Sequence, residues 1–173
     1  MRRFDASEGP RVVGPSDGAF VDLGGTGVRF MIRGEESGGG FSLVEHPIPP
    51  GHLAAPMHRH SLEDEYSFVL EGRLGALLGD DEVYAEAGDL VFKPRDQWHT
   101  FWNAGETTCR ILEIISPAGF EHYFDDAVEG SRSDDELDAR YGTQTDLEAT
   151  RLVCERHALT LPPLPVPRDG RRD

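Results

Sequence analysis

Between residues 19 and 115 the chain repeats one pattern: short stretches with alternating or continuous apolar residues, separated by turns rich in glycine. This pattern predicts short strands, because successive side chains of a strand point to opposite faces. We expect strands over residues 19–23, 28–32, 41–46, 53–60, 65–70, 74–78, 82–85, 90–93, 98–102 and 109–115. The third of these should end before Pro47, since proline cannot donate to a ladder. Many short strands with such turns indicate a β-sandwich or barrel.

After residue 115 the period changes to that of helices. Ser116-Pro117 resembles an N-cap followed by proline at the first helical position. The aromatic and apolar residues that follow lie at helical spacing and predict a face buried on the sheet: Phe120, Tyr123, Phe124 and Val128. Two capping boxes, Ser133 to Glu136 and Thr145 to Glu148, predict further helices over residues 134–141 and 146–158.

These patterns divide the chain into four segments. We expect an N-terminal arm (1–18), a barrel (19–115), a helical extension (116–160) and a tail rich in proline and arginine (161–173), which is extended or disordered. A length of 173 residues suits one domain with a substantial core.

Charge and cysteine content narrow the class of protein. The formal net charge of −15 argues against a nucleic-acid partner and against an anionic membrane surface. No apolar run is long enough to span a bilayer, and the N-terminus lacks the apolar core of a signal peptide. Cys109 and Cys154 do not form a disulfide framework, so we expect free thiols and a cytoplasmic protein.

The pair His58-Arg59-His60 carries the strongest chemical signal. In a strand, residues i and i+2 share a face, so both imidazoles should point the same way. Glu65 follows past a short turn and can fold back to supply an oxygen. A third histidine, His99, lies in a later strand that could pair beside the first. Imidazole and carboxylate ligands suit iron, manganese, nickel, cobalt, zinc or copper.

Two segments resemble the conserved motifs of the cupin superfamily. The first motif is matched by Gly51, His58-x-His60, Glu65 and Gly72, and the second by Gly88, Pro94, His99 and Asn103 in GDLVFKPRDQWHTFWN. Asp96 stands where the second motif usually has glycine. If that position requires a positive φ, aspartate tolerates it better than most residues.

The resemblance implies a mainly β protein, a double-stranded β-helix of the jelly-roll or cupin type, followed here by a few C-terminal helices. It implies one divalent transition metal (Fe, Mn, Ni, Zn, Co or Cu) with His58, His60, Glu65 and His99 as ligands. One or two coordination positions would stay open for water, dioxygen or a chelating oxygen substrate. Glu65 is also the candidate catalytic base.

Other polar and aromatic residues receive structural interpretations. Phe101 shares the face of His99 and is a weak candidate for the wall of a substrate pocket. Glu63 and Asp64 are either partners that orient the histidines or solvated turn residues, and we favour the second interpretation. The remaining histidines are interpreted as surface residues: His46, His52, His122 and His157. The predicted cavity is closed and mostly apolar, with few acids or bases besides Glu65.

The favoured function is a metal-dependent, dioxygenase-like oxidoreductase acting on a small oxygenated or aromatic compound. Two alternatives remain open: a metal-dependent isomerase, cyclase or lyase, and a cupin that binds a small molecule without turnover. We also expect a homodimer in which the N-terminal strands, 19–23 and 28–32, cover exposed edges of the partner barrel.

Overall fold

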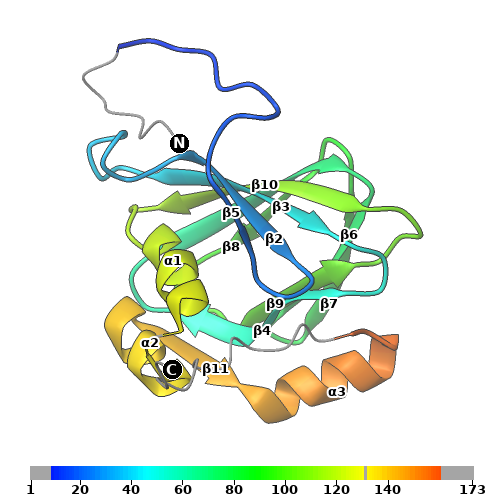
Figure 1. The fold of residues 1–173 in the computed structure, drawn as a ribbon. Coiled ribbons are helices and arrows are strands. Elements are labelled where there is room, and N and C mark those ends of the chain that lie inside the picture. The colour runs from blue at the N-terminus through cyan, green and yellow to red at the C-terminus, as the bar shows by residue number, and fades with distance from the viewer. Residues whose placement is uncertain (1–8, 131, 161–173) are drawn as a thin grey trace, which may run out of the picture.

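A computed structural model describes residues 9–130 and 132–160 of the chain. In this part the chain forms two antiparallel sheets that face each other, with helices along one side (Figure 1). The elements are β1 (Phe20–Asp22), β2 (Gly27–Ile32), β3 (Ser42–Ile48), β4 (Leu53–His60), β5 (Asp64–Glu71), β6 (Arg73–Leu78), β7 (Asp81–Glu86), β8 (Leu90–Lys93), β9 (His99–Asn103), β10 (Cys109–Ser116), α1 (Glu121–Glu129), α2 (Asp134–Tyr141), β11 (Thr143–Asp146) and α3 (Leu147–His157).

The strand order defines the barrel. One sheet has the order β1-β2-β3-β10-β5-β8 and the other the order β11-β4-β9-β6-β7. Side chains from the inner faces of both sheets fill the space between them. This confirms the mainly β, jelly-roll prediction with C-terminal helices. It also confirms each expected strand, with ends that shift by one or two residues.

One strand boundary was predicted wrongly. The strand β3 continues through Pro47 to Ile48 instead of ending before the proline. Pro47 lies opposite Arg110 of β10, whereas the register with β2 extends only to Glu45. One side of β3 is therefore free of a partner strand at Pro47, and a strand tolerates proline at such a position.

The helical extension differs from the prediction at its start. The helix α1 begins at Glu121 after Phe120, and Ser116-Pro117 is not its cap. Gly119 intervenes with φ = 136°, a conformation that no helix accommodates. Phe120 and Phe124 are buried as expected, but Val128 is 40% exposed.

The later helices follow the prediction more closely. Ser133 and Glu136 form the predicted capping box of α2. For α3 the cap is Asp146, whose side chain accepts a hydrogen bond from the Ala149 backbone, rather than Thr145.

The short strand β11 between these helices was not predicted. It pairs with β4 and so extends the sheet that carries His58 and His60.

Two of the core clusters connect the extension to the barrel. The aromatic side of α1 packs with Val28, Phe30 and Val44 of the first sheet. On the other side, Val153 of α3 packs against the outer face of β4 and β9, which contribute the side chains of Leu53, Met57 and Trp102. The extension thus covers both one opening of the barrel and the back of the strand that carries the histidine pair.

Several other expectations concern the chain as a whole. The strands β1 and β2 join the sheet of their own chain, next to β3. Cys109 and Cys154 are both free. None of the helices within residues 9–130 and 132–160 is long and apolar enough to cross a membrane. The predicted tail, 161–173, and most of the predicted arm's first half lie outside the described residues.

Candidate metal centre

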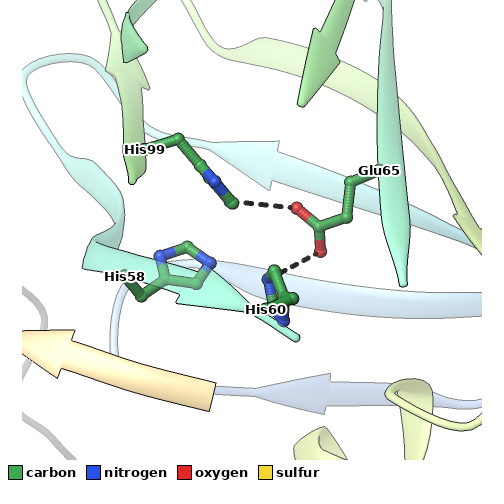
Figure 2. Close-up of side chains that lie close together, drawn as sticks. All are labelled: His58, His60, Glu65 and His99. Atoms are coloured by element: carbon green, nitrogen blue, oxygen red, sulfur yellow. Dashed lines mark ion pairs between the residues drawn. The ribbon is translucent and has the colours of Figure 1, made fainter. Parts of the chain in front are cut away.

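Three strands bring the four predicted ligands together. His58 and His60 lie on β4 with side chains on the same face, and His99 of β9 is the register partner of His58. Glu65 comes from β5 of the opposite sheet, after a turn that reverses the chain. The four side chains point toward one another inside the barrel (Figure 2), and each is buried.

Each histidine is held through the ring nitrogen that faces away from the centre. Nδ1 of His58 lies 2.7 Å from the Pro56 carbonyl oxygen, and Nδ1 of His99 lies 2.9 Å from that of Gln97. A carbonyl oxygen can only accept, so both Nδ1 atoms carry the proton. Nδ1 of His60 lies 2.7 Å from the Glu63 carboxylate. The two carbonyl contacts fix the tautomers of His58 and His99 and leave their Nε2 atoms with a lone pair, as metal ligation requires.

The inward-facing atoms fit a metal ion. Nε2 of His60 and Nε2 of His99 are buried without a hydrogen-bond partner, and each lies 3.3 Å from a Glu65 oxygen. One candidate ligand atom from each of the four residues lies within 4.8 Å of the others. Three imidazoles and one carboxylate are a common donor set for divalent transition metals. This buried cluster could therefore hold a metal ion.

Burial and neighbouring charges shift the pKa values of three of the candidate ligands. Burial, with the neighbouring rings of His99 and His60, lowers the pKa of His58 well below its ordinary value, so this imidazole is neutral. Burial also opposes charge on His60, but Glu65 and Glu63 outweigh it and raise the pKa of His60. Burial alone would raise the pKa of Glu65, yet Lys93 and His60 hold it well below its ordinary value. Glu65 is therefore a carboxylate across the neutral pH range.

The structure corrects the interpretation of Glu63. It is 3% exposed and orients His60, so it is not a solvated turn residue. Asp64, by contrast, is partly exposed and pairs with the Arg95 guanidinium, which lowers the pKa of Asp64 to about 2. The difference follows from strand alternation, because adjacent residues at the start of a strand point to opposite sides. Asp96, next to Arg95, has φ = 63°, in the region anticipated for it.

A second charged group lies beside the cluster and was not predicted. Lys93 is fully buried, with Nζ 2.8 Å from Glu65 and 2.6 Å from Glu113. The only sequence signal was parity: Lys93 lies two residues after Val91 on β8, so the two share an inward face. Glu113 lies on β10, far from Lys93 in the sequence, so no local pattern predicted the ion pair.

The cluster opens into a cavity of about 110 Å³. This is room for on the order of ten water molecules, so it suits a small organic compound. Apolar side chains dominate the walls: Phe101, Phe120, Tyr123, Phe124, Ala54, Ala55 and Ala127 line it. Phe101, the weak candidate from the sequence, is one of these wall residues.

Three further ionisable residues of the wall correct the prediction of a cavity with few acids or bases. Glu113, His46 and Asp138 all line it. His46 is 4% exposed and is not a surface histidine. Alternation within the expected strand grouped Phe41, Leu43 and Glu45 on one face, whereas the structure buries the other face, which carries Val44 and His46.

The comparisons with known proteins agree with this architecture. Residues 45–115 match the model of the cupin domain. TcmJ, a tetracenomycin polyketide synthase protein of Streptomyces glaucescens, is 28% identical over 94 residues, which cover 54% of this chain and 62% of that protein. The chain therefore spans somewhat less than two thirds of the relative it matches.

Solved structures share the fold at low sequence identity. KdgF from Halomonas sp. superposes with a TM-score of 0.57 and 16% identity, covering 66% of this chain and 99% of KdgF. Pac13 of Streptomyces, described as a nucleoside dehydratase, has a TM-score of 0.54 and 12% identity, covering 66% of this chain and 88% of Pac13. These likenesses establish the barrel and leave the chemistry to the site itself.

Proposed function

We propose that this protein binds one divalent transition metal through His58, His60, Glu65 and His99 and uses it in a redox-neutral reaction. The reaction class is isomerisation, cyclisation or elimination on a small oxygenated aromatic compound. The observation that carries this proposal is the set of four ligand atoms that lie close together at one end of a mostly apolar cavity. When bound, the metal would supply Lewis-acid stabilisation of negative charge on a substrate oxygen.

The residues of the cavity suit such a substrate. Phe101, Phe120 and Phe124 offer flat apolar surfaces and exclude water, which strengthens electrostatic interactions at the cluster. The relative TcmJ belongs to a polyketide synthase. That name supports an oxygenated aromatic or polyketide-like substrate for this chain.

Glu65 is better suited to ligation than to proton transfer. Lys93 holds one of its oxygens at 2.8 Å and keeps its pKa low, so the carboxylate has little tendency to take a proton at neutral pH. Its predicted role as catalytic base is therefore disfavoured. A dioxygenase, the favoured hypothesis from sequence, remains the second candidate, because the ligand set leaves open positions that dioxygen could occupy.

Metal analysis is the first experiment. The full chain, purified without chelators or nickel resin, should contain about one equivalent of metal by elemental analysis. His60→Ala should lose stoichiometric metal and keep the barrel folded by circular dichroism, because it removes one inward-facing donor. His52→Ala, which changes a histidine outside the cluster, is the matched control. Full metal occupancy in His60→Ala would contradict the ligand assignment.

Oxygen dependence then separates the two candidate reactions. Turnover of hydroxylated aromatic ketones should proceed equally in air and under anaerobic conditions if the reaction is redox-neutral. Product formation only in air, with consumption of dioxygen, would establish the dioxygenase instead. Tight binding without any product would favour the non-catalytic alternative.

We also propose a homodimer and a cytoplasmic location. The support for the dimer is an apolar outer face on the first sheet, which five side chains of β5 and β8 form together: Tyr66, Phe68, Leu70, Leu90 and Phe92. A single chain leaves four of these five between 37% and 55% exposed, and exposed apolar faces of this kind commonly mark interfaces.

A further inference from the structure

A chain of buried polar groups runs from the candidate metal ligands along the cavity wall. Nζ of Lys93 bridges Oε2 of Glu65 and Oε1 of Glu113. Oε1 of Glu113 also accepts a hydrogen bond of 2.7 Å from the Ser67 hydroxyl. The lysine and the serine therefore both engage the same oxygen, and the second oxygen, Oε2, is directed elsewhere.

That second oxygen faces His46. Nε2 of His46 lies 3.5 Å from Oε2 of Glu113, and Nδ1 lies 3.2 Å from the Gly27 carbonyl oxygen. Since a carbonyl oxygen only accepts, Nδ1 carries a proton and the tautomer is fixed. The rings of Phe101 and Phe124 contact the imidazole edge-on, with centroids 6.4 and 5.6 Å away. His46 therefore presents Nε2 in a defined direction at an apolar wall.

The charge on Glu113 determines what Nε2 can do. Burial would raise the pKa of Glu113, but the Lys93 ammonium outweighs burial and holds that pKa below its ordinary value. Glu113 is therefore a carboxylate, and its Oε2 lies where it can balance the charge of a proton transferred to Nε2 of His46. The 3.5 Å separation is longer than an ordinary N–H···O hydrogen bond, which leaves Nε2 open to a group in the cavity.

We propose that His46 is a catalytic residue that takes a proton from the substrate and returns it, while Glu113 positions the ring and balances its charge. The inference rests on the redox-neutral function proposed above and deepens it. The substrate class is an aryl ketone with a C–H bond next to the carbonyl group. Neither His46 nor Glu113 belongs to the candidate metal ligands, so this pair is a separate functional unit of the cavity.

The proposed step is balanced without an oxidant. The C–H bond next to the carbonyl breaks, its electron pair moves to form an enolate, and the proton binds Nε2 of His46. The resulting imidazolium is paired with the Glu113 carboxylate. Return of the proton to a different carbon gives isomerisation. Delivery of the proton to a departing hydroxyl gives water and an eliminated product.

Deuterium exchange tests this step with a defined probe. The full metal-loaded chain is incubated with α-hydroxyacetophenone in D₂O, and loss of the proton next to the carbonyl is followed by NMR. The wild-type protein should accelerate exchange over buffer. His46→Gln should lower the exchange rate by about 10²-fold, the usual scale of general acid–base catalysis, with metal content and melting temperature unchanged.

A histidine outside the cavity is the matched control. Nδ1 of His52 lies 3.0 Å from the Pro50 carbonyl oxygen, a contact of the same kind as that of His46. His52→Gln should therefore exchange at the wild-type rate. Glu113→Gln provides a second variant, in which the charge disappears but the shape remains. It should also slow exchange while the metal content persists.

The outcomes separate this inference from the function on which it rests. Wild-type exchange in His46→Gln, or no exchange by metal-loaded wild type, would overturn the proposal and leave the metal site standing. Loss of metal in a folded His46→Gln protein would assign His46 a structural role and overturn the proposal as well. If His46→Gln fails to fold, near-normal exchange in Glu113→Gln would overturn the pairing. Exchange that depends on His46 in a protein without metal would support the pair and contradict the metal function.

Discussion

At the scale of single residues, the site combines a low-dielectric interior with many charged groups. Glu65, Lys93 and Glu113 are each at most 3% exposed. Removing one partner of a buried ion pair leaves an uncompensated charge, which typically costs about 3–5 kcal/mol. The stability of the barrel therefore depends on Glu65, Lys93 and Glu113, which also form part of the site.

The first prediction concerns Glu65 as a ligand. Glu65→Gln should lower metal affinity by at least about tenfold, since even residues that only orient metal ligands contribute 10–100-fold. Glu71→Gln, the same substitution at an exposed position of the same strand, is the control. Metal binding can be titrated by calorimetry. Unchanged affinity in Glu65→Gln, with strongly reduced turnover, would instead support the base role that the sequence suggested.

A second prediction concerns acid stability of the chelator-treated chain. The pKa values of Glu65 and Glu113 are both lower in the folded protein than their ordinary value of 4.5. A carboxyl with a lowered pKa stabilises the fold above the unfolded-state pKa, and that contribution disappears as pH falls below it. Urea unfolding should therefore show a falling free energy of unfolding as pH decreases below about 4.5.

The lysine variant weakens this effect at the two carboxyl groups. In Lys93→Met the ammonium that most strongly lowers both pKa values is absent, so both pKa values rise. The contribution that disappears on acidification is then smaller, so Lys93→Met should lose less stability between neutral and acidic pH than wild type. Equal pH dependence in the two proteins would show that the carboxyl groups do not control acid unfolding.

At the scale of elements, the extension after residue 116 completes the site. The strand β11 pairs with β4 so that Thr143 lies opposite His60 and Thr145 opposite His58. Gly142 precedes β11 with φ = 67°, and a Cβ there would lie 2.5 Å from the Ser61 hydroxyl oxygen. The junction between α2 and β11 therefore has no room for a side chain, directly beside the turn that leads from His60 to Glu65.

The third prediction uses this crowding. Gly142→Ala should destabilise the protein by about 1–3 kcal/mol more than Gly38→Ala, which is the usual cost of overpacking. Gly38 has a nearly identical φ of 69° but open space around it, so both variants share the backbone strain and only one has the steric clash. Thermal unfolding measures the difference. Equal melting temperatures would mean that the junction can move aside without cost.

At the scale of the whole molecule, the outer face of β5 and β8 is the basis of the predicted homodimer. The N-terminal strands occupy an edge of the sheet in their own chain, so the apolar outer face is the better candidate for the contact. Burial of that face would remove exposed aromatic and aliphatic side chains from water, which is favourable at about 25 cal/mol per Å².

The fourth prediction tests this face. The wild-type chain should have the mass of a dimer by light scattering, and Leu90→Glu should shift the mass toward the monomer, because it places a charge within the contact. Leu152→Glu on α3 is the matched control, as the two leucines are 55% and 51% exposed. A monomer mass at all concentrations in the wild type would rule out the dimer.

Local patterns and the resemblance together predicted the barrel and the four inward-facing donors. Strand alternation is a local property of the pleated backbone, so the parity of His58 and His60 follows from their spacing alone. The motifs then supplied Glu65 and His99. The capping box at Ser133 is equally local, and it predicted α2 to the residue.

Which charged groups meet, and which elements cover the cavity, depends on the long-range arrangement of the strands. Lys93, Glu113 and His46 lie on three strands, and their proximity depends on how β8, β5, β10 and β3 are ordered in one sheet. Strand order depends on pairing between distant segments, which no local pattern encodes. The same holds for β11, whose four residues become a strand only because the edge of β4 offers hydrogen-bond partners.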